Sequence, residues 1–128
     1  IGSYTLGAIM SIAFNYPMPA VDGNVMRILS RQFLIEEDIS KPKSKKTFEN
    51  KVMTLMGNNP SEFNQALMEL GALICTPKNP KCMVCPIQEI CMGYKENRIY
   101  EKIYWDHYHC YLFRCSSNFV ATCGDDVG

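Results

Sequence analysis

Two segments near the start of the chain have the hydrophobic pattern of helices. Residues 5–16 are apolar on nearly every face and stop before a pair of prolines, which predicts a buried central helix. Residues 22–34 place apolar side chains at helical spacing, with Arg27 and Arg31 four residues apart on another face. This spacing predicts an amphipathic helix directly after Asp22, so Asp22 should lie at its N-terminus.

A lysine-rich stretch separates these helices from the next one. Four lysines fall within residues 41–46, which we interpret as a polar linker. Apolar positions from Phe48 onward predict a third helix that ends at about Gly57. The run of positive charge is compatible with phosphate contact and equally with a solvated loop before a helix. The pattern leaves both interpretations open.

The fourth helix has a good start signal. Asn59 suits the N-cap, Pro60 suits the first helical position, and Glu62 follows three residues after the cap. An apolar stripe continues from there and leads into Cys75. A short last helix is expected over residues 86–94.

Residues 97–128 do not continue this pattern, and no element is predicted for this tail. Aromatic residues follow one another without a helical period, and the alternation over residues 108–113 has no convincing hairpin partner. Some tail residues have metal-binding side chains, but their spacings fit no metal site, so we interpret them as incidental. They are His107, His109, Cys110, Cys115 and Cys123.

Composition sets the broad class of protein. The 128 residues suit one ordinary domain, and 13 Lys and Arg balance 13 Asp and Glu, so net charge alone indicates no polyanionic partner. No apolar run reaches the ~18 residues that suggest a membrane span. The chain has 7 cysteines, four of them close together, and no secretory signal, which favours metal ligation in a reducing compartment over disulfides. We therefore expect a cytoplasmic protein.

Four cysteines give the strongest functional signal. Cys75, Cys82, Cys85 and Cys91 have the spacing C-x6-C-x2-C-x5-C, between two predicted helices. Four thiolates in so compact a loop suit either a zinc ion or a cubane iron–sulfur cluster. Zinc sites commonly use two C-x2-C pairs and this loop has one, so the spacing favours [4Fe–4S].

This spacing resembles the iron–sulfur loop of the endonuclease III superfamily of DNA glycosylases. The segment FNQALMELGALICTPK, which contains the first cysteine, is similar to the adenine glycosylase (MutY) branch. The resemblance covers about residues 1–96 and implies an all-α, partial helix-hairpin-helix glycosylase fold. It implies a helical domain over residues 1–74 and a loop over residues 75–96 that binds a structural [4Fe–4S] cluster. In such loops the residues between the first two cysteines contact DNA phosphates, which here implies Lys78 and Lys81.

The start of the chain resembles the second half of the helix-hairpin-helix motif. Gly2, Ser3, Tyr4 and Thr5 then enter a helix whose unpaired backbone N–H groups can hold one DNA phosphate without reading sequence. Tyr4 occupies the position where bifunctional members carry a Schiff-base lysine. Without that amine there is no imine route to strand cleavage, which implies a monofunctional glycosylase.

Asp22 lies in the motif Val-Asp-Gly-Asn-Val, which resembles the adenine-specific branch, whereas the pyrimidine-specific branch has Val-Asp-Thr-His-Val. The resemblance implies that Asp22 stabilises the cationic sugar formed as adenine leaves a mispair with 8-oxoguanine or guanine, and that Asn24 holds this carboxylate. N-capping is the other role open to Asp22, and the two are compatible. The family's acidic glutamate is expected upstream of residue 1, and the acidic turn Glu36-Glu37-Asp38 is expected to be solvent-exposed.

We therefore expect a base excision repair glycosylase that acts as a monomer on double-stranded DNA, away from membranes, in a bacterial cytoplasm and at the nucleoid. The chain is expected to be an inactive fragment, without the first hairpin helix, the acid and the 8-oxoguanine-recognition domain, and with apolar helix faces exposed. Two alternatives remain. A non-catalytic cluster-bearing or zinc-bearing DNA-binding module is opposed by Asp22-Gly-Asn, and a pyrimidine-damage glycosylase with lyase activity is opposed by Tyr4.

Overall fold

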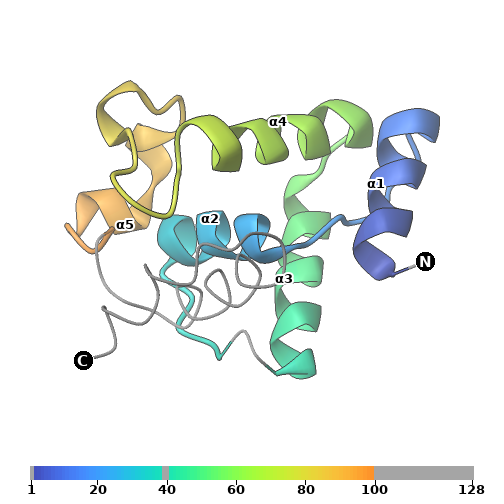
Figure 1. Ribbon diagram of the computed structural model, residues 1–128, viewed down its shortest axis with the longest axis horizontal. Coiled ribbons are helices and arrows are strands. Elements are labelled where there is room, and N and C mark those ends of the chain that lie inside the picture. Colours follow the sequence, from blue (N-terminus) through green and yellow to red (C-terminus); the bar gives the residue numbers. More distant parts are fainter. Residues whose placement is uncertain (1, 39–40, 100–128) are drawn as a thin grey trace, which may run out of the picture.

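The part of the chain that the structure describes consists of helices and their connections. The structure is a computed structural model, and it describes residues 2–38 and 41–99 (Figure 1). The helices are α1 (Ser3–Phe14), α2 (Gly23–Phe33), α3 (Pro42–Leu55), α4 (Pro60–Leu73), the short 3-10 turns η1 (Cys82–Val84) and η2 (Gln88–Ile90), and α5 (Met92–Lys95). No strand occurs among these described residues, so the prediction of an all-α fold is confirmed. The predicted tail features at residues 107–123 lie outside the described residues.

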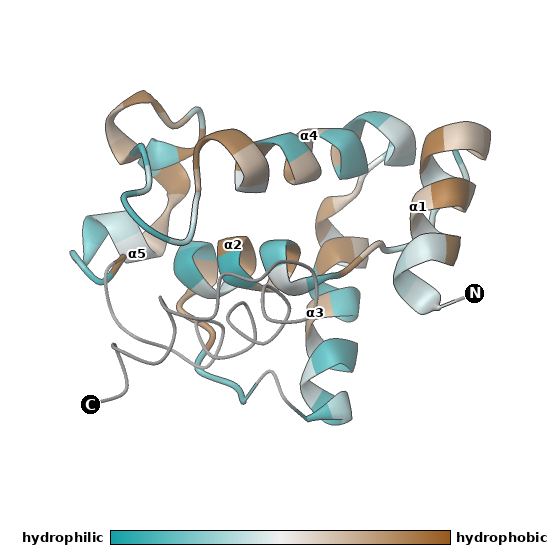
Figure 2. Ribbon diagram, in the orientation of Figure 1, coloured by the Kyte–Doolittle hydropathy of each residue, from teal (hydrophilic) through white to brown (hydrophobic). Residues whose placement is uncertain are grey.

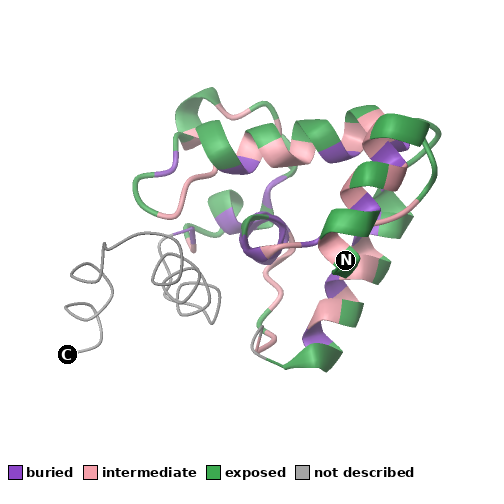
Figure 3. Ribbon diagram, turned by 45° about the vertical axis from the view of Figure 1, so that its right-hand side comes forward, coloured by how far each residue is buried: buried purple, intermediate pink, exposed green. Residues whose placement is uncertain are grey.

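Helix α2 is the centre of the arrangement because α3, α4 and α5 all contact it. Helix α4 runs above α2, and α1 packs against α4 at the end of the molecule opposite α5 (Figure 1). Figure 3 shows α2 as the most deeply buried helix, and nine of its eleven residues are buried. Both the aspartate at its start and the cysteine loop near its end are therefore attached to one rigid element.

The hydrophobic core lies where α2 meets α3. Leu29 of α2 and Phe48 and Val52 of α3 are completely shielded from solvent. Full burial of such a side chain contributes about 1.5–3 kcal/mol relative to an exposed one. The other buried members are Val21, Val25, Met26 and Met56, with Phe33, Ile35, Phe63 and Leu67 packed around them.

The predicted starts of α2 and α4 are confirmed. Asp22 is the N-cap of α2 and accepts a hydrogen bond from the backbone N–H of Val25 at 2.9 Å. Asn59 is the N-cap of α4 and accepts from the backbone N–H of Glu62 at 3.2 Å, with Pro60 at the first helical position. Each side chain satisfies one of the N–H groups that a helix start leaves without an intrahelical partner.

The prediction that residues 41–46 form a linker is wrong, because α3 begins at Pro42. Proline is favourable at the first position of a helix, and lysine has good intrinsic helix propensity. The hydroxyl of Ser44 donates to the backbone carbonyl of Asp38 at 2.5 Å, which holds the first turn against the preceding chain. The lysine run is therefore a helical surface that begins α3.

Two other boundaries also differ from the prediction. The first helix covers Ser3–Phe14 rather than 5–16, because Asn15 adopts a left-handed conformation with φ of 52°. The predicted helix over residues 86–94 is replaced by η2 and α5, because the backbone at Cys91 is extended and interrupts helical hydrogen bonding. Periodicity of hydrophobic residues does not reveal such local changes of backbone conformation.

Helix α1 is not buried in this chain, contrary to the prediction of a central core helix. Of its residues only Gly7 and Ser11 are buried, whereas Leu6, Ile9 and Phe14 are exposed. Figures 2 and 3 show this apolar, exposed surface on the outer side of α1. The expected exposure of apolar helix surface is therefore observed. None of the described helices has the length and apolar character that crossing a membrane requires.

Gly7 allows close packing between α1 and the chain that leads into α2. A Cβ atom on Gly7 would lie 1.9 Å from the carbonyl oxygen of Pro19. Next to this contact, the side-chain amide of Asn64 donates to the hydroxyl of Ser11 at 2.8 Å and to the carbonyl of Met18 at 3.0 Å. These contacts fix α1 and α4 against the segment that ends at Asp22.

We predict that Gly7→Ala destabilises the protein although alanine is the better helix former. Overpacking costs about 1–3 kcal/mol, which exceeds the ~1 kcal/mol that alanine gains over glycine in a helix. Thermal unfolding should show a Tm lowered by several degrees. The control Thr5→Ala, at an exposed position of the same helix, should leave Tm nearly unchanged. A Tm for Gly7→Ala equal to or above the wild-type value would contradict the close contact with Pro19.

Candidate functional site

The carboxylate of Asp22 lies at the N-terminus of α2 and accepts two hydrogen bonds. One oxygen accepts from the backbone N–H of Val25 at 2.9 Å, and the other accepts from the side-chain amide of Asn24 at 3.3 Å. The positive end of the helix dipole favours a negative charge at this place. Asp22 is half-buried, so its carboxylate is held by the helix and still faces the surface.

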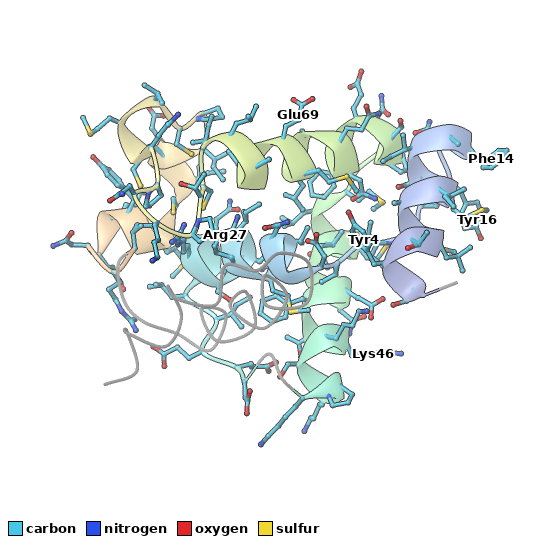
Figure 4. The ribbon with its side chains drawn as sticks, in the orientation of Figure 1. Tyr4, Phe14, Tyr16, Arg27, Lys46 and Glu69 are labelled. Carbon is cyan, nitrogen blue, oxygen red and sulfur yellow. The ribbon has the colours of Figure 1, made fainter. Side chains whose placement is uncertain are left out.

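Tyr4 of α1 lies beside this carboxylate. Figure 4 shows its ring directed from α1 toward the start of α2, whereas Phe14 and Tyr16 point away from the molecule. Burial, followed by the charge of Asp22, raises the pKa of the Tyr4 hydroxyl above its ordinary value. Tyr4 is therefore a neutral phenol at physiological pH and can donate one hydrogen bond.

Arg27 connects the aspartate to the cysteine loop. Its side chain is completely buried, and its guanidinium donates to the side-chain oxygen of Asn24 at 2.9 Å, to the carbonyl of Gly71 at 2.8 Å and to the carbonyl of Cys75 at 2.9 Å. Because Asn24 also donates to Asp22, hydrogen bonds run without interruption from the carboxylate to the first cysteine of the loop.

Arg31, one turn further along α2, binds the start of the cysteine loop. Its guanidinium donates to the carbonyl of Thr76 at 2.7 Å, to the carbonyl of Pro77 at 3.0 Å and to the sulfur of Cys75 at 3.3 Å. Neither arginine is predicted from the sequence to take part in the site. Their position in the sequence could have indicated this role, because the two arginines share one face of the helix that follows the Asp-Gly-Asn motif.

The four loop cysteines line one pocket between α2, the end of α4 and α5. Cys91 is buried and the other three are half-buried. Burial raises the pKa of the Cys82 and Cys85 thiols, and the charge of Cys75 raises both further. Several thiolates brought together in this way repel one another, and a bound metal core supplies the positive charge that offsets the repulsion.

The donor set and its surroundings fit an iron–sulfur group. Much of the pocket wall between the cysteines is apolar, and the side chains of Arg31, Gln32 and Gln88 also line it. The apolar residues include Ile28, Ile74, Ile87 and Ile99. Four cysteine ligands in an enclosed, water-poor site are typical of such clusters. Within the described ranges, no three His, Cys, Asp or Glu side chains gather closely enough to hold a single metal ion.

The residues predicted to contact DNA lie at two places. Gly2–Thr5 begin α1, and the first backbone hydrogen bond of this helix runs from the N–H of Leu6 to the carbonyl of Gly2. Lys78 and Lys81 are exposed between the first two cysteines, beyond the C-terminal end of α4, whereas α1 contacts the N-terminal end of α4 through Ser61. Fourteen residues of α4 span about 21 Å, so the structure does not bring the two sets together into one small site.

The acidic turn lies at the opposite end of α2 from Asp22. Glu36 forms an ion pair with Arg98, and Glu37 accepts a hydrogen bond from the hydroxyl of Thr47 at 3.4 Å. Of the three acidic residues Glu36 is exposed, whereas Glu37 and Asp38 are half-buried, so the expected solvent exposure is complete for Glu36 and partial for the other two. Eleven residues of α2 span about 16 Å, which separates this turn from the Asp22 carboxylate.

Known proteins share both the cysteine loop and the helical arrangement. Residues 75–91 match the iron–sulfur binding domain of endonuclease III. The chain is 49% identical over 105 residues to the adenine DNA glycosylase of Schizosaccharomyces pombe and 44% identical over 92 residues to that of Homo sapiens. These alignments cover 77% and 71% of this chain but only 22% and 17% of the two relatives, so the chain spans about a fifth of their length.

A solved structure, that of a thermostable thymine-DNA glycosylase, is similar with a TM-score of 0.65 and 31% identity, and the match covers 75% of this chain and 44% of the other. The described helices thus have the helix-hairpin-helix DNA glycosylase fold, and the predicted fold class is confirmed. The cysteine spacing, the shared pocket and the match over residues 75–91 identify an iron–sulfur cluster site. With these similarities in sequence and structure, the chain belongs to the adenine DNA glycosylase family.

Proposed function

We propose that this chain carries the catalytic aspartate and the cluster loop of an enzyme that hydrolyses the N-glycosidic bond of adenine in double-stranded DNA. The observation that carries the proposal is the position of Asp22 at the start of α2, with Asn24 bonded to its carboxylate and Tyr4 beside it. The names of the relatives support adenine as the base released. Adenine opposite 8-oxoguanine or guanine is the proposed substrate of the whole protein.

Asp22 performs electrostatic stabilisation in this proposal. An enzyme must flip adenine out of the stack to reach the glycosidic bond, and departure of the base leaves positive charge on the sugar. A carboxylate fixed by Val25 and Asn24 stabilises that charge without having to reorganise. Water then attacks the sugar and leaves an abasic site. The proposal assigns no acid role to Glu36 or Glu37, which lie at the other end of α2.

Tyr4 supports a reaction without strand cleavage. A lyase of this superfamily needs an amine that forms an imine with the sugar, and a phenol cannot form one. The raised pKa of Tyr4 keeps the hydroxyl protonated beside Asp22, where it can donate a hydrogen bond. We therefore assign Tyr4 to the substrate pocket of a monofunctional glycosylase.

DNA contact is proposed at two separate places, the start of α1 and the loop that follows α4. The backbone N–H groups at Gly2–Thr5 suit one phosphate, because a helix start offers unpaired donors and a favourable dipole. Lys78 and Lys81 are exposed in the cysteine loop and suit phosphates farther along the duplex. Contacts of this type position the duplex without reading its sequence, so they suit an enzyme that must search undamaged DNA.

The cluster is proposed to be [4Fe–4S], held by Cys75, Cys82, Cys85 and Cys91. When bound, it supplies a rigid cross-link between the end of α4 and the start of α5. Arg31 donates to the sulfur of Cys75, and this contact stabilises a thiolate ligand. Arg27 binds the backbone carbonyl of Cys75, and Arg31 binds the two carbonyls that follow it, so both arginines fix the start of the loop against α2.

We predict that anaerobically purified protein contains about four irons per chain and absorbs broadly near ~400 nm. Cys85→Ser should lower both the iron content and this absorption, since it removes one thiolate ligand. Cys115→Ser, outside the loop, is the matched control and should keep both. Stoichiometric zinc without iron in the wild-type preparation would contradict the cluster assignment.

We predict that Asp22→Asn, in the full-length protein that carries this chain, lowers the single-turnover rate of adenine release by at least about 10²-fold. DNA binding should change little, because the charge is needed only as the sugar becomes cationic. Asparagine caps helices about as well as aspartate, so the start of α2 should persist. Glu69→Gln, on the outer side of α4 (Figure 4), is the control and should keep the wild-type rate. A rate for Asp22→Asn close to wild type would remove Asp22 from its catalytic role.

A further inference from the structure

The first turns of α3 bring two lysines to the N-terminal end of α1. The ammonium of Lys45 donates to the hydroxyl oxygen of Ser3 at 2.7 Å, a contact between residues 42 positions apart in sequence. Lys46 is exposed, and Figure 4 shows its side chain extending from α3 on the side of the molecule where α1 begins. Figures 1 and 3 both place the N-terminal half of α3 below that end of α1.

This arrangement gathers positive charge at one place. The N-terminus of a helix carries partial positive charge, so a cation beside it is electrostatically unfavourable. Helix α1 has no acidic residue in its first turn, and its N-cap, Gly2, provides no side-chain hydrogen bond. Among the described residues, the recorded ion pairs join Arg98 to Glu36 and Glu96 and involve neither Lys45 nor Lys46. An anion bound between α1 and the two lysines would remove the conflict.

The contact with Ser3 also leaves hydrogen-bond donors available. The Ser3 oxygen accepts from Lys45, so its own O–H can still donate. Lys45 has two further N–H donors, and Lys46 supplies a second ammonium. By contrast, Lys51 of the same helix packs over the ring of Phe33, 4.0 Å from its centroid, within the protein. The contact between Lys45 and Ser3 therefore brings donors from α3 and α1 together at the beginning of α3.

We propose that Ser3, Lys45, Lys46 and the backbone N–H groups at the start of α1 form one phosphodiester-binding site, through which the DNA contact of the hairpin helix extends onto α3. The proposal rests on the proposed function because DNA is taken as the polyanion. Of the lysines at residues 41–46, Lys45 and Lys46 are the two that contact phosphate in this proposal. A phosphodiester has two non-bridging oxygens that share one negative charge, and Lys45 and the α1 amides can bind them from two sides.

Salt dependence of binding to an undamaged DNA duplex tests this site independently of catalysis. For duplex DNA, each neutralised phosphate contributes about 0.9 to the slope of log K against log salt concentration. In the full-length protein, Lys45→Ala and Lys46→Ala together should reduce this slope by about 1, and binding at low salt should weaken several-fold. The single variant Lys46→Arg should keep most of the contribution that Lys46 makes to this slope, since arginine also binds phosphate.

The matched control is Lys95→Ala, which removes an exposed lysine from α5 at the opposite end of the molecule and should keep the wild-type slope. A slope for the double variant equal to that of wild type, with folding verified by thermal unfolding, would overturn the proposed site. Adenine release by wild-type protein is measured separately. Its absence, together with a reduced slope in the lysine variants, would refute the proposed glycosylase function and still support the phosphate site.

Discussion

The buried guanidinium of Arg27 is the constraint on which the rest of the described structure depends. A charged group that is shielded from solvent is tolerated only when hydrogen bonds satisfy it. The guanidinium of Arg27 donates such bonds to Asn24, Gly71 and Cys75. The Gly71 carbonyl lies in the last turn of α4, where the negative end of the helix dipole favours a cation. A Cβ atom at Gly71 would lie 3.1 Å from the Cδ1 atom of Ile28 and 3.4 Å from the guanidinium, so α2 and α4 pack closely at this position. Arg27 thereby fixes the end of α4 and the first cysteine to α2.

At the other end of this contact, Asp22 combines a structural and a chemical role. Its oxygen that accepts from Val25 begins α2, and its second oxygen is bound by Asn24, which is itself held by Arg27. The carboxylate is therefore oriented by the same helix that supports the cysteine loop. Loss of order in that loop should disturb the aspartate, because three successive hydrogen bonds, through Asn24 and Arg27, connect the two. Helix α2 thus supports both the cluster site and the proposed catalytic site, although the pocket of four cysteines lies away from Asp22.

Local signals in the sequence predicted the elements that depend on local physics. Asn59-Pro60 and Asp22 were correctly placed at helix starts, because a cap side chain acts within a few residues, and the four cysteines were found from their spacing alone. The charge of the lysine stretch is typical of a linker, but Pro42 and the helix propensity of lysine make this stretch the first turns of α3. The burial of Arg27 and Arg31 was not predicted, since an arginine face on an amphipathic helix has the pattern of a solvent-exposed face. Only the partners contributed by α4 and the cysteine loop, more than forty residues away, show that this face is interior.

The most direct test of this account is the adenine-release rate of Arg27→Lys, measured in single turnover in the full-length protein and normalised to iron content. Lysine keeps the charge but cannot reproduce the three directed bonds of the guanidinium, and disruption of such a buried network costs about 3–5 kcal/mol. We predict a lower Tm and a rate reduced at least about tenfold even in molecules that contain the cluster. Arg98→Lys, at the surface ion pair with Glu36, is the matched substitution and should keep both values near wild type. A wild-type Tm and rate for Arg27→Lys would show that the aspartate and the cysteine loop are positioned independently of each other.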